Sequence, residues 1–569
     1  MRIWKSAVAI ALALMMAVPA GATQGEDTVR QRQEDLDTLY TTLERAHPDL
    51  FANTPEEVFL ARKGEIQAGL AEMDDVTFAL ELQSLTALAG DSHTSVAMGS
   101  ALGQAVRYYP LALTWRDGAW YLTTATADSR DLLGQEVTAL NGRTMEEIVT
   151  AFGRVLSADN PVKLRRQYRQ TCNVANFYEY LGLAERGGAM ALTFAGGRTL
   201  EVDPVPAGEL GAMEIVQLSA TVPQPATAEQ DRNYVAFPLN EATYYIQYNA
   251  CAEDPDLPMA TFAAQVQADL NGGDYGRILL DLRNNGGGSD GVIWPLLAVL
   301  RQEMDRGKQV VGLIGEATFS SAIINAVELQ EMGAPLVGER TSGSVDHFGA
   351  VRSFRLPNSG LQVGVSSQYI DLGTLLDADA GRGVEPLEPD ILVAQTMPDT
   401  LAGRDTAVEW LLANPQRLEQ KEYPDAPLTR GRFAALLWQA AGSLESEGEA
   451  FSDALGIEWY LPALTWARAS GVAAGTGEGL FQSSRPITRQ EAAVMLVRAA
   501  DLINVELGSG EADLTAEEQP APWAKGAVLR LAKAGWTAGA MDPTATMTRE
   551  EGQELVRLLG ERASLRSSQ

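Results

Sequence analysis

Apolar residues in the first hundred positions of the chain recur at helical spacing. Segments 36–40 and 78–82 place apolar side chains three or four residues apart, which is the period of an amphipathic helix. From 108 to 205 the pattern changes to short alternating stretches, such as 120–124 and 190–194, which is typical of strands. We therefore predict a helical region at 27–95 and a mixed β region at 96–232.

The middle of the chain, 233–414, alternates apolar runs with helical patterns and predicts an α/β core. Helices are expected at 289–300, 320–331 and 405–412. The run Arg-Ile-Leu-Leu-Asp-Leu at 277–282 leads into three glycines, and the run Val-Val-Gly-Leu-Ile at 310–314 leads to a serine pair that opens a helix. Two strands thus bring a bare backbone loop and a hydroxyl to one edge of a sheet, as an acyl-transfer enzyme requires.

Ser320 and Ser321 both stand at this junction of strand and helix. The N–H groups and the dipole at a helix start favour a developing oxyanion, although a serine there is also a good N-cap. The Ser321 N–H lies close to Ser320 Oγ by geometry. Gly286, Gly287 or Gly288 can supply a second donor, because glycine has no Cβ to block a tetrahedral centre. Three glycines are equally compatible with a tight turn.

After position 424 the chain becomes rich in alanine and contains an internal repeat. Thr-Arg pairs begin at 429, 488 and 548, and Trp459 recurs as Trp523. Several residue types kept at one offset indicate a repeated supersecondary unit. Threonine caps the free N–H groups of a helix start, and arginine offers a planar fork to a carboxylate. Arg489 and Arg549 therefore either bind an anionic ligand or pair with neighbouring acids in a structural bundle.

Composition narrows the partners and the compartment. The 569 residues include 75 acidic and 44 basic side chains, for a net charge of -31, which argues against nucleic acid or an anionic membrane as a partner. This length predicts two or three domains. Arg2 and Lys5, an apolar run at 7–18 and Ala-Gly-Ala at 20–22 predict a signal peptide at 1–22 and export. No later segment approaches a transmembrane length.

Cys172 and Cys251 are the two cysteines of the chain. In an exported protein two cysteines can pair, but buried free thiols are also compatible with the sequence. The sequence contains no His-Glu-x-x-His motif, no paired cysteine motif and no phosphate loop, so we predict neither a metal nor a cofactor.

Three motifs of the core act together as a family signature. Asp-Leu-Arg-Asn-Asn-Gly-Gly-Gly at 281–288, Thr-Phe-Ser-Ser-Ala at 318–322 and Val-Gly-Glu-Arg-Thr-Ser-Gly at 337–343 resemble the tail-specific, or C-terminal processing, serine peptidase superfamily. The resemblance spans about 27–414. It implies a serine peptidase on a crotonase-like spiral of β-β-α units, with a PDZ-like element within 133–149. It also aligns the nucleophile with Ser320, and it makes Gly287 the match for the second oxyanion donor beside the Ser321 N–H.

The general base is where this sequence departs from the processing peptidases. Those relatives pair their serine with a lysine further along the chain, but no lysine occurs between Gln309 and Gln420, and the expected position holds Val345. A Ser-Lys dyad of that kind is therefore excluded, and the base has to be a histidine.

The chain has three histidines. His93, in Gly-Asp-Ser-His-Thr-Ser at 90–95, resembles the histidine segment of tricorn-like relatives, which makes it the expected base. His347 lies 27 residues after Ser320 and is the alternative base, or else a substrate or oxyanion contact. His47 precedes a proline in a helical region and is expected to be structural.

A carboxylate should orient the imidazole of the base. The segment Gly-Val-Glu-Pro-Leu-Glu-Pro-Asp-Ile at 383–391 resembles the Glu-Pro-Asp-Ile motif of the family, and Glu388 matches that motif residue by residue. Glu385 in the preceding Gly-Val-Glu-Pro is a second candidate. Asp91 is nearer to His93 in sequence, but we expect it to cap its own turn.

The repeats at 423–561 resemble S-layer homology modules through segments 451–453, 459–460 and 487–491 together with Gly471. In that family such modules hold exported proteins on pyruvylated cell-wall polysaccharide. The resemblance implies an all-α tail that binds an anionic secondary cell-wall polysaccharide. The candidate binding residues are Arg489, Arg549, Trp459 and Trp523. The first copy lacks its front half and has Arg432 where an acid is usual.

These motifs together predict an exported, wall-anchored serine hydrolase, most simply a peptidase acting on peptide or protein. In it Ser320 attacks, His93 acts as base and Glu388 orients the ring. The alternative is a non-catalytic wall protein that binds a ligand or peptide on the same fold, as in the retinoid-binding branch of the superfamily.

Overall fold

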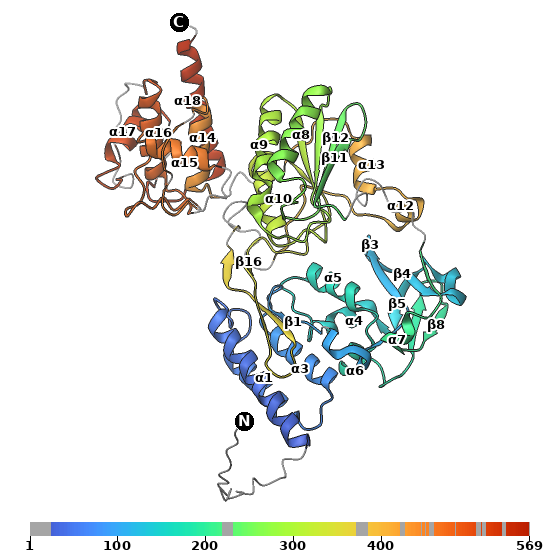
Figure 1. Cartoon of the computed structure of the whole chain (residues 1–569). Coiled ribbons are helices and arrows are strands. Elements are labelled where there is room, and N and C mark those ends of the chain that lie inside the picture. The colour runs from blue at the N-terminus through green and yellow to red at the C-terminus, as the bar shows by residue number, and fades with distance from the viewer. Residues whose placement is uncertain are drawn as a thin grey trace, which may run out of the picture.

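The computed structural model shows a mixed α/β protein with several sheets (Figure 1). It describes residues 24–98, 100–218, 231–370, 372, 385–420, 427–444, 446–449, 451–454, 460–483, 485–507, 514, 519–536 and 542–567. The expected signal peptide and Trp459 lie outside these residues. No helix in the described ranges is long and apolar enough to cross a membrane.

Three helices form the N-terminal region, as the helical spacing predicts. They are α1 (Gln24–Ala46), α2 (Glu56–Gly69) and α3 (Asp75–Ala87). Their apolar faces pack on a small sheet in which β18 pairs with both β1 and β17. Its strands are β1 (Ser95–Val96), β17 (Arg352–Arg355) and β18 (Gln362–Val365). The N-terminal helices therefore complete their core with a hairpin that comes from the middle of the chain.

The region 96–232 contains a seven-stranded antiparallel sheet, as the alternating pattern predicts. Its strands are β3 (Ala112–Arg116), β4 (Ala119–Thr126), β5 (Glu136–Leu140), β6 (Arg143–Thr144), β7 (Met190–Phe194), β8 (Thr199–Val202) and β10 (Ile215–Gln217). The helices are α4 (Met145–Phe152), α5 (Pro161–Thr171), α6 (Ala175–Tyr180) and α7 (Ala207–Leu210). Short elements complete it: η1 (Ser100–Ala105), β2 (Arg107–Tyr108), η2 (Ala127–Leu132) and β9 (Val205–Pro206).

The central sheet has the order β11-β12-β13-β14-β15-β20 and is parallel from β12 onward. Its strands are β11 (Tyr234–Pro238), β12 (Thr243–Tyr248), β13 (Arg277–Asp281), β14 (Gln309–Ile314), β15 (Leu336–Gly338) and β20 (Ile391–Leu392). Every residue of β12, β13 and β14 is buried, which explains why β13 and β14 appear in the sequence as apolar runs without alternation.

Helices connect the parallel strands of this sheet. They are α8 (Met259–Gly272), α9 (Trp294–Asp305) and α10 (Ser321–Glu331), with η3 (Asp290–Ile293) leading into α9. Two further helices, α12 (Met397–Ala402) and α13 (Thr406–Ala413), follow the last strand. A separate strand pair joins β16 (His347–Gly349) to β19 (Gln368–Ile370). The predicted helix at 289–300 begins as the 3-10 turn η3 and becomes α-helical only from Trp294.

The tail consists of α14 (Arg430–Ala440), α15 (Leu461–Ala469), α16 (Arg489–Leu502), α17 (Lys525–Ala534) and α18 (Arg549–Ser567), which share one apolar core. Thr429 and Thr488 cap their helices through the side chain, as the Thr-Arg motif predicts. Isolated bridges such as Thr429 to Pro486 and Thr488 to Thr546 join the starts of successive repeats. The repeat thus packs around a common centre.

The tail also contacts the central domain at the C-terminal end of α10. Arg432 forms an ion pair of 2.5 Å with the buried Glu331, and Gln420 Nε2 donates to the carbonyl groups of Gln330 and Ala334. This pairing gives the unusual arginine of the first repeat a structural role.

Cys172 and Cys251 are both buried and free, so the free-thiol alternative is the one seen in the structure.

Candidate active site

A buried ion-pair cluster fixes the start of the glycine loop. Arg283, the arginine of the Asp-Leu-Arg motif, pairs with Asp281 and makes two parallel hydrogen bonds of 2.8 and 2.7 Å to the Asp405 carboxylate. Asp405 also caps α13, and Tyr245 donates to Asp281. The end of β13 is therefore fastened to a helix before the glycines begin.

Ser320 lies between β14 and α10 in a backbone conformation that is rare for a residue with a side chain. Its φ is 54°, and its side chain makes no capping hydrogen bond to the helix. A conformation of this kind costs on the order of 1–3 kcal/mol and is found at nucleophile turns, where it presents the hydroxyl. The geometry argues against a pure capping role for Ser320.

Gly287 packs closely against Ser320. Its φ is +100°, and a Cβ at this position would lie 2.7 Å from Ser320 Cβ and 3.1 Å from Ser321 N. No other residue fits without displacing the serine. The glycine loop and the helix start therefore meet at one point, as the two motifs predict.

Ser321 has a different role from its neighbour. It is buried, and its Oγ donates a hydrogen bond of 2.8 Å to the Gly288 carbonyl. This bond ties the helix start to the glycine loop and occupies the hydroxyl proton. Among the described residues, Ser320 Oγ has no such partner.

The backbone of the glycine loop limits which N–H groups are free for an oxyanion. The Gly287 N–H donates to Asn285 Oδ1 at 2.9 Å, so it is already engaged. Gly288 forms a parallel bridge with Cys251, in which the flanking Gly287 O and Ser289 N make the hydrogen bonds. The Gly288 carbonyl faces Ser321 instead. Among the described residues the Gly288 N–H makes no hydrogen bond, so it is available as a donor.

His93 lies beside the residue that precedes the nucleophile. Its ring stacks on Phe319 at 4.5 Å between centroids and on His347 at 5.5 Å. Both ring nitrogens are buried, and among the described residues neither makes a hydrogen bond of normal geometry, although the Phe348 backbone lies close enough to affect the ring. The structure thus places His93 against Phe319, the residue before Ser320, with His347 stacked on His93, and in the described residues no hydrogen bond joins the serine to either imidazole.

Burial keeps both imidazoles neutral. Desolvation, together with the neighbouring His347 and against the opposing effect of Asp91, lowers the pKa of His93 to about 3. Burial likewise lowers the pKa of His347. His347 Nδ1 is 3.0 Å from the Ser344 carbonyl, so Nδ1 carries the proton and Nε2 holds a free lone pair.

Asp91 is the carboxylate beside these rings. Its carboxylate accepts hydrogen bonds from the backbone N–H of His93 and from the hydroxyls of Thr94 and Ser366. His47 Nε2 lies 3.3 Å from Oδ2 of the same carboxylate. Burial raises the pKa of Asp91, but these hydrogen bonds outweigh burial and hold it below its ordinary value. The predicted turn cap is therefore present, and Oδ1 also lies 3.9 Å from His93 Nδ1.

The structure does not bring the predicted glutamates to the histidines. Glu388 is half-exposed and pairs with Arg340 at 2.6 Å. Glu385 is exposed, and its backbone carbonyl accepts the Val345 N–H. Both lie on a segment that runs beside the His347 loop, but in the described residues neither carboxylate has a hydrogen bond to an imidazole.

Lys163 is a site residue that the sequence analysis missed. It is buried at the start of α5, and its Nζ lies 3.4 Å from the centroid of the Phe319 ring. The family pattern places a lysine base after the nucleophile, whereas this lysine comes from the β region before the core. Only a tertiary contact reveals it.

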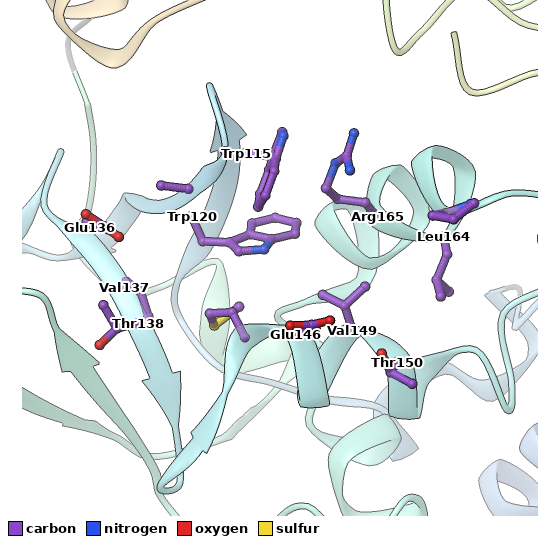
Figure 2. A pocket seen from close by; sticks show the side chains of 14 residues that line it. Trp115, Trp120, Glu136, Val137, Thr138, Glu146, Val149, Thr150, Leu164 and Arg165 are labelled. Atoms are coloured by element: carbon purple, nitrogen blue, oxygen red, sulfur yellow. The ribbon is translucent and has the colours of Figure 1, made fainter. Parts of the chain in front are cut away.

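Two cavities flank the site. One of about 420 Å³ is lined by Asp91, Asp159, His347, Phe348 and Tyr369 together with residues of the N-terminal region. The other, of about 550 Å³, lies over the predicted PDZ-like region, where the Trp115, Trp120 and Arg165 side chains gather between strands and helices (Figure 2).

Arg165 connects the second cavity to the nucleophile loop. It lies over the Trp115 ring at 4.6 Å and pairs with Glu316 at 3.0 Å. Glu316 stands four residues before Ser320.

The described residues contain no group of three histidine, cysteine or acidic side chains placed to hold a metal ion.

The predicted wall-binding residues are divided between several environments. Arg489 pairs with Glu551 at 2.6 Å, and Arg549 lines a cavity of about 700 Å³ between the tail and the central domain. Trp523 is 60% exposed. Both the carbohydrate and the structural interpretation of the arginines thus find support in their surroundings.

Comparisons with known proteins bear first on the tail. Residues 450–493 match the family model of the S-layer homology domain. The tail contains an S-layer homology domain. This finding confirms the predicted resemblance for those residues and fits an association with the cell surface or cell wall.

Comparisons with solved structures find distant similarity over about two thirds of the chain. Mature CPAF complexed with lactacystin is 15% identical, with a TM-score of 0.48 and coverage of 68% of this chain and 98% of that one. The photosystem II D1 C-terminal processing protease is 13% identical, with a TM-score of 0.31 and coverage of 64% and 93%. No curated protein matches the chain in sequence. Since similarity this low carries no argument about activity, function has to be argued from the site.

Proposed function

We propose that this protein is a serine-type peptidase held on the cell wall by its tail. The observation that carries the proposal is the contact of Gly287 with Ser320 Cβ and Ser321 N. It places a glycine loop, a strained serine and a helix start at one point, and His93 stacks on the adjacent Phe319. These are the parts that acyl transfer needs.

In the proposed reaction Ser320 Oγ attacks the carbonyl carbon of a peptide bond and its proton passes to the free lone pair of His93. The C–N bond then breaks, the leaving amine takes that proton from His93, and an acyl-enzyme remains. A water molecule gives its proton to His93 and attacks the ester. The acid product leaves as Ser320 regains the proton. His347 is the alternative base, because its Nε2 is also unprotonated.

The oxyanion hole uses the Ser321 N–H and one glycine N–H. The sequence favours Gly287, but the Asn285 side chain holds the Gly287 N–H. Gly288 therefore supplies the second donor, since its N–H is available and its carbonyl already contacts Ser321. Such donors contribute about 10²–10³-fold in rate each.

The carboxylate that orients His93 has two candidates. Asp91 Oδ1 lies 3.9 Å from His93 Nδ1, whereas Glu388 acts only if Arg340 releases it. We take Asp91 as the orienting group and keep Glu388, with Glu385 beside it, as the alternative from sequence. If Glu388→Gln stops the reaction and Asp91→Asn does not, the role belongs to Glu388.

The cellular setting follows from the two ends of the chain. The predicted signal peptide directs export, and the S-layer homology domain attaches the protein to an anionic secondary wall polysaccharide through Arg489 and Arg549. The substrate is a peptide or protein at the cell surface.

The deciding experiment is covalent labelling with a fluorophosphonate, whose phosphorus is attacked by the serine oxygen as fluoride leaves. We expect wild type to be labelled, Ser320→Ala to be unlabelled, and Ser321→Ala to keep labelling at a reduced rate because it loses only the tie to Gly288. If a folded wild type is not labelled at all, the alternative of a non-catalytic binding protein replaces this proposal.

A further inference from the structure

Lys163 occupies a place where a charged side chain is costly. It is 7% exposed, and in the described part of the chain its Nζ makes no hydrogen bond or ion pair. An ammonium group buried in this way loses much of its hydration, and an apolar side chain would fill the space at lower cost. Packing alone therefore does not account for a lysine here.

The position of Lys163 is set by the loop that carries His347. Asn160 caps α5 by accepting the Lys163 N–H at 2.9 Å. The same side chain donates to the Ser342 carbonyl at 3.1 Å and to Ser344 Oγ at 3.0 Å. The helix start, and with it the lysine, is fixed to the central domain.

Phe319 lies between the lysine and the candidate base. Lys163 Nζ is 3.4 Å from the ring centroid, and the His93 ring is stacked on the same ring at 4.5 Å and 20°. Both groups cannot share one face at these distances without overlapping, so they occupy opposite faces. An ammonium over an aromatic face is attracted by the ring quadrupole, which holds the ring in place.

Charged groups around Lys163 come from three elements. Arg166 lies on the same helix, Asp159 precedes the helix, and Asp91 lies on the loop after α3. Burial, together with Arg166 and against the two carboxylates, lowers the pKa of Lys163 to about 7. Burial raises the pKa of Asp159 to about 6. The lysine therefore carries its charge in the acid range and loses it above neutrality.

The geometry points to Lys163 as a positioning residue of the active site, whose ammonium holds the Phe319 ring against His93 and adds to the effect of burial in keeping His93 neutral. Two effects of one charge act together. The contact with the ring fixes the surface on which His93 stacks. The positive charge also opposes a second positive charge on the imidazole.

The inference rests on the proposed function only for its catalytic consequence, and the position and ionisation of His93 are measurable without it. The chain has three histidines, so selective ¹³C labelling of histidine gives three signals to follow by NMR. Single His→Gln variants assign them.

We expect Lys163→Met to raise the titration midpoint of His93 by about one pH unit, because a nearby positive charge is removed. Lys163→Arg keeps the charge and stacks on the ring, so its midpoint should stay near that of wild type. The matched control is Lys63→Met, which removes a lysine that lies over Tyr40 at 5.1 Å on α2, away from the site. It should leave His93 unchanged.

The catalytic consequence is read from the rate of fluorophosphonate labelling against pH. Wild type should lose rate as pH rises past about 7, where Lys163 becomes neutral, whereas Lys163→Arg should not. Lys163→Met should be slower by tenfold or more at neutral pH, since misplacement of a catalytic group costs on the order of 10²-fold.

The NMR titration of His93 and the labelling rate distinguish a failure of the proposed role of Lys163 from a failure of the peptidase proposal. Equal His93 midpoints in wild type, Lys163→Met and Lys163→Arg overturn the role of Lys163, even if Ser320 is labelled. A shifted midpoint without labelling of wild type overturns the peptidase proposal and leaves the role of Lys163 in place. If Lys163→Met does not fold, wild type and Lys163→Arg are compared instead. An identical dependence of their labelling rates on pH above 7 overturns the proposed role of Lys163.

Discussion

At the scale of single residues, Gly287 and Gly286 offer a matched pair. A Cβ at Gly287 meets Ser320 Cβ at 2.7 Å, whereas a Cβ at Gly286 meets nothing within 4 Å, and only Gly287 has a positive φ. We expect Gly287→Ala to lower the labelling rate at least 10²-fold, because the added Cβ displaces Ser320 and the Ser321 N–H and loss of one oxyanion donor already costs that much, and Gly286→Ala to keep most of the rate. Equal rates in the two variants would contradict the proposed contact.

The pKa of His93 gives a second prediction at this scale. An ordinary imidazole titrates near 6.5, but burial lowers the pKa of His93 to about 3. The acid limb of the labelling rate should therefore lie well below pH 6, because His93 remains an unprotonated base down to that range. A limb at pH 6–7 would show that a solvated histidine is the base.

The same shift carries a consequence for stability, and its sign is fixed. Below pH 6.5 the unfolded chain protonates His93 and the folded chain does not, so folding stability falls as pH drops from 6.5 toward 3. His93→Gln should reduce this loss. Chemical unfolding of wild type and His93→Gln at pH 7 and pH 5 measures the change in unfolding free energy between the two pH values.

At the scale of elements, the clamp between β13 and α13 predicts a large stability effect. Asp405 is buried, and its carboxylate receives both hydrogen bonds from Arg283. Asp405→Ala leaves a buried guanidinium short of a partner and should cost about 3–5 kcal/mol of unfolding free energy. Arg404→Ala, which breaks the exposed pair with Asp399, is the control and should cost at most about 1 kcal/mol. Urea unfolding compares the two.

The elements were the most predictable part of the molecule. Alternating strands and apolar helices follow from local patterns, so β7 and α10 appear where the sequence predicts them, within one residue. The two motifs at the sheet edge predict the meeting of Gly287 and Ser320 for the same reason, because parallel strands end at one edge.

Long-range side-chain contacts were not predictable. Lys163 reaches Phe319 from another region of the chain, and Glu388 pairs with Arg340 rather than with an imidazole. Sequence spacing carries no information on either contact, since both depend on how separate elements pack. The glutamate suggested by the family motif is for this reason the least supported member of the site.

At the scale of the whole molecule, the tail and the central domain are coupled. A chain shortened to end at Gln420 should still be labelled, because no residue proposed for catalysis lies beyond it. It should nevertheless have a lower Tm, since the buried Glu331 loses its ion pair with Arg432. Glu331→Gln in the shortened chain should recover part of that loss, and an unchanged Tm on shortening would mean that the contact does not form in solution.

Attachment to the wall is a separate property of the whole chain. We expect the full protein to sediment with purified wall and to lose this binding when ketal-linked pyruvate is removed. Arg489→Lys should weaken binding, because an ammonium cannot reproduce the bidentate fork. Equal binding to both wall preparations would assign Arg489 to its pair with Glu551 alone.

The small sheet under the N-terminal helices has a consequence for the order in which the chain folds. Asp35 on α1 accepts hydrogen bonds from Asn358 and Ser359 at the turn of the β17–β18 hairpin, more than 300 positions later in the sequence. During synthesis the first helices emerge long before that hairpin, so their apolar face has no partner while most of the chain is made. Such an exposed face favours aggregation and recognition by chaperones. The first segment to be made is therefore among the last to reach its final packing.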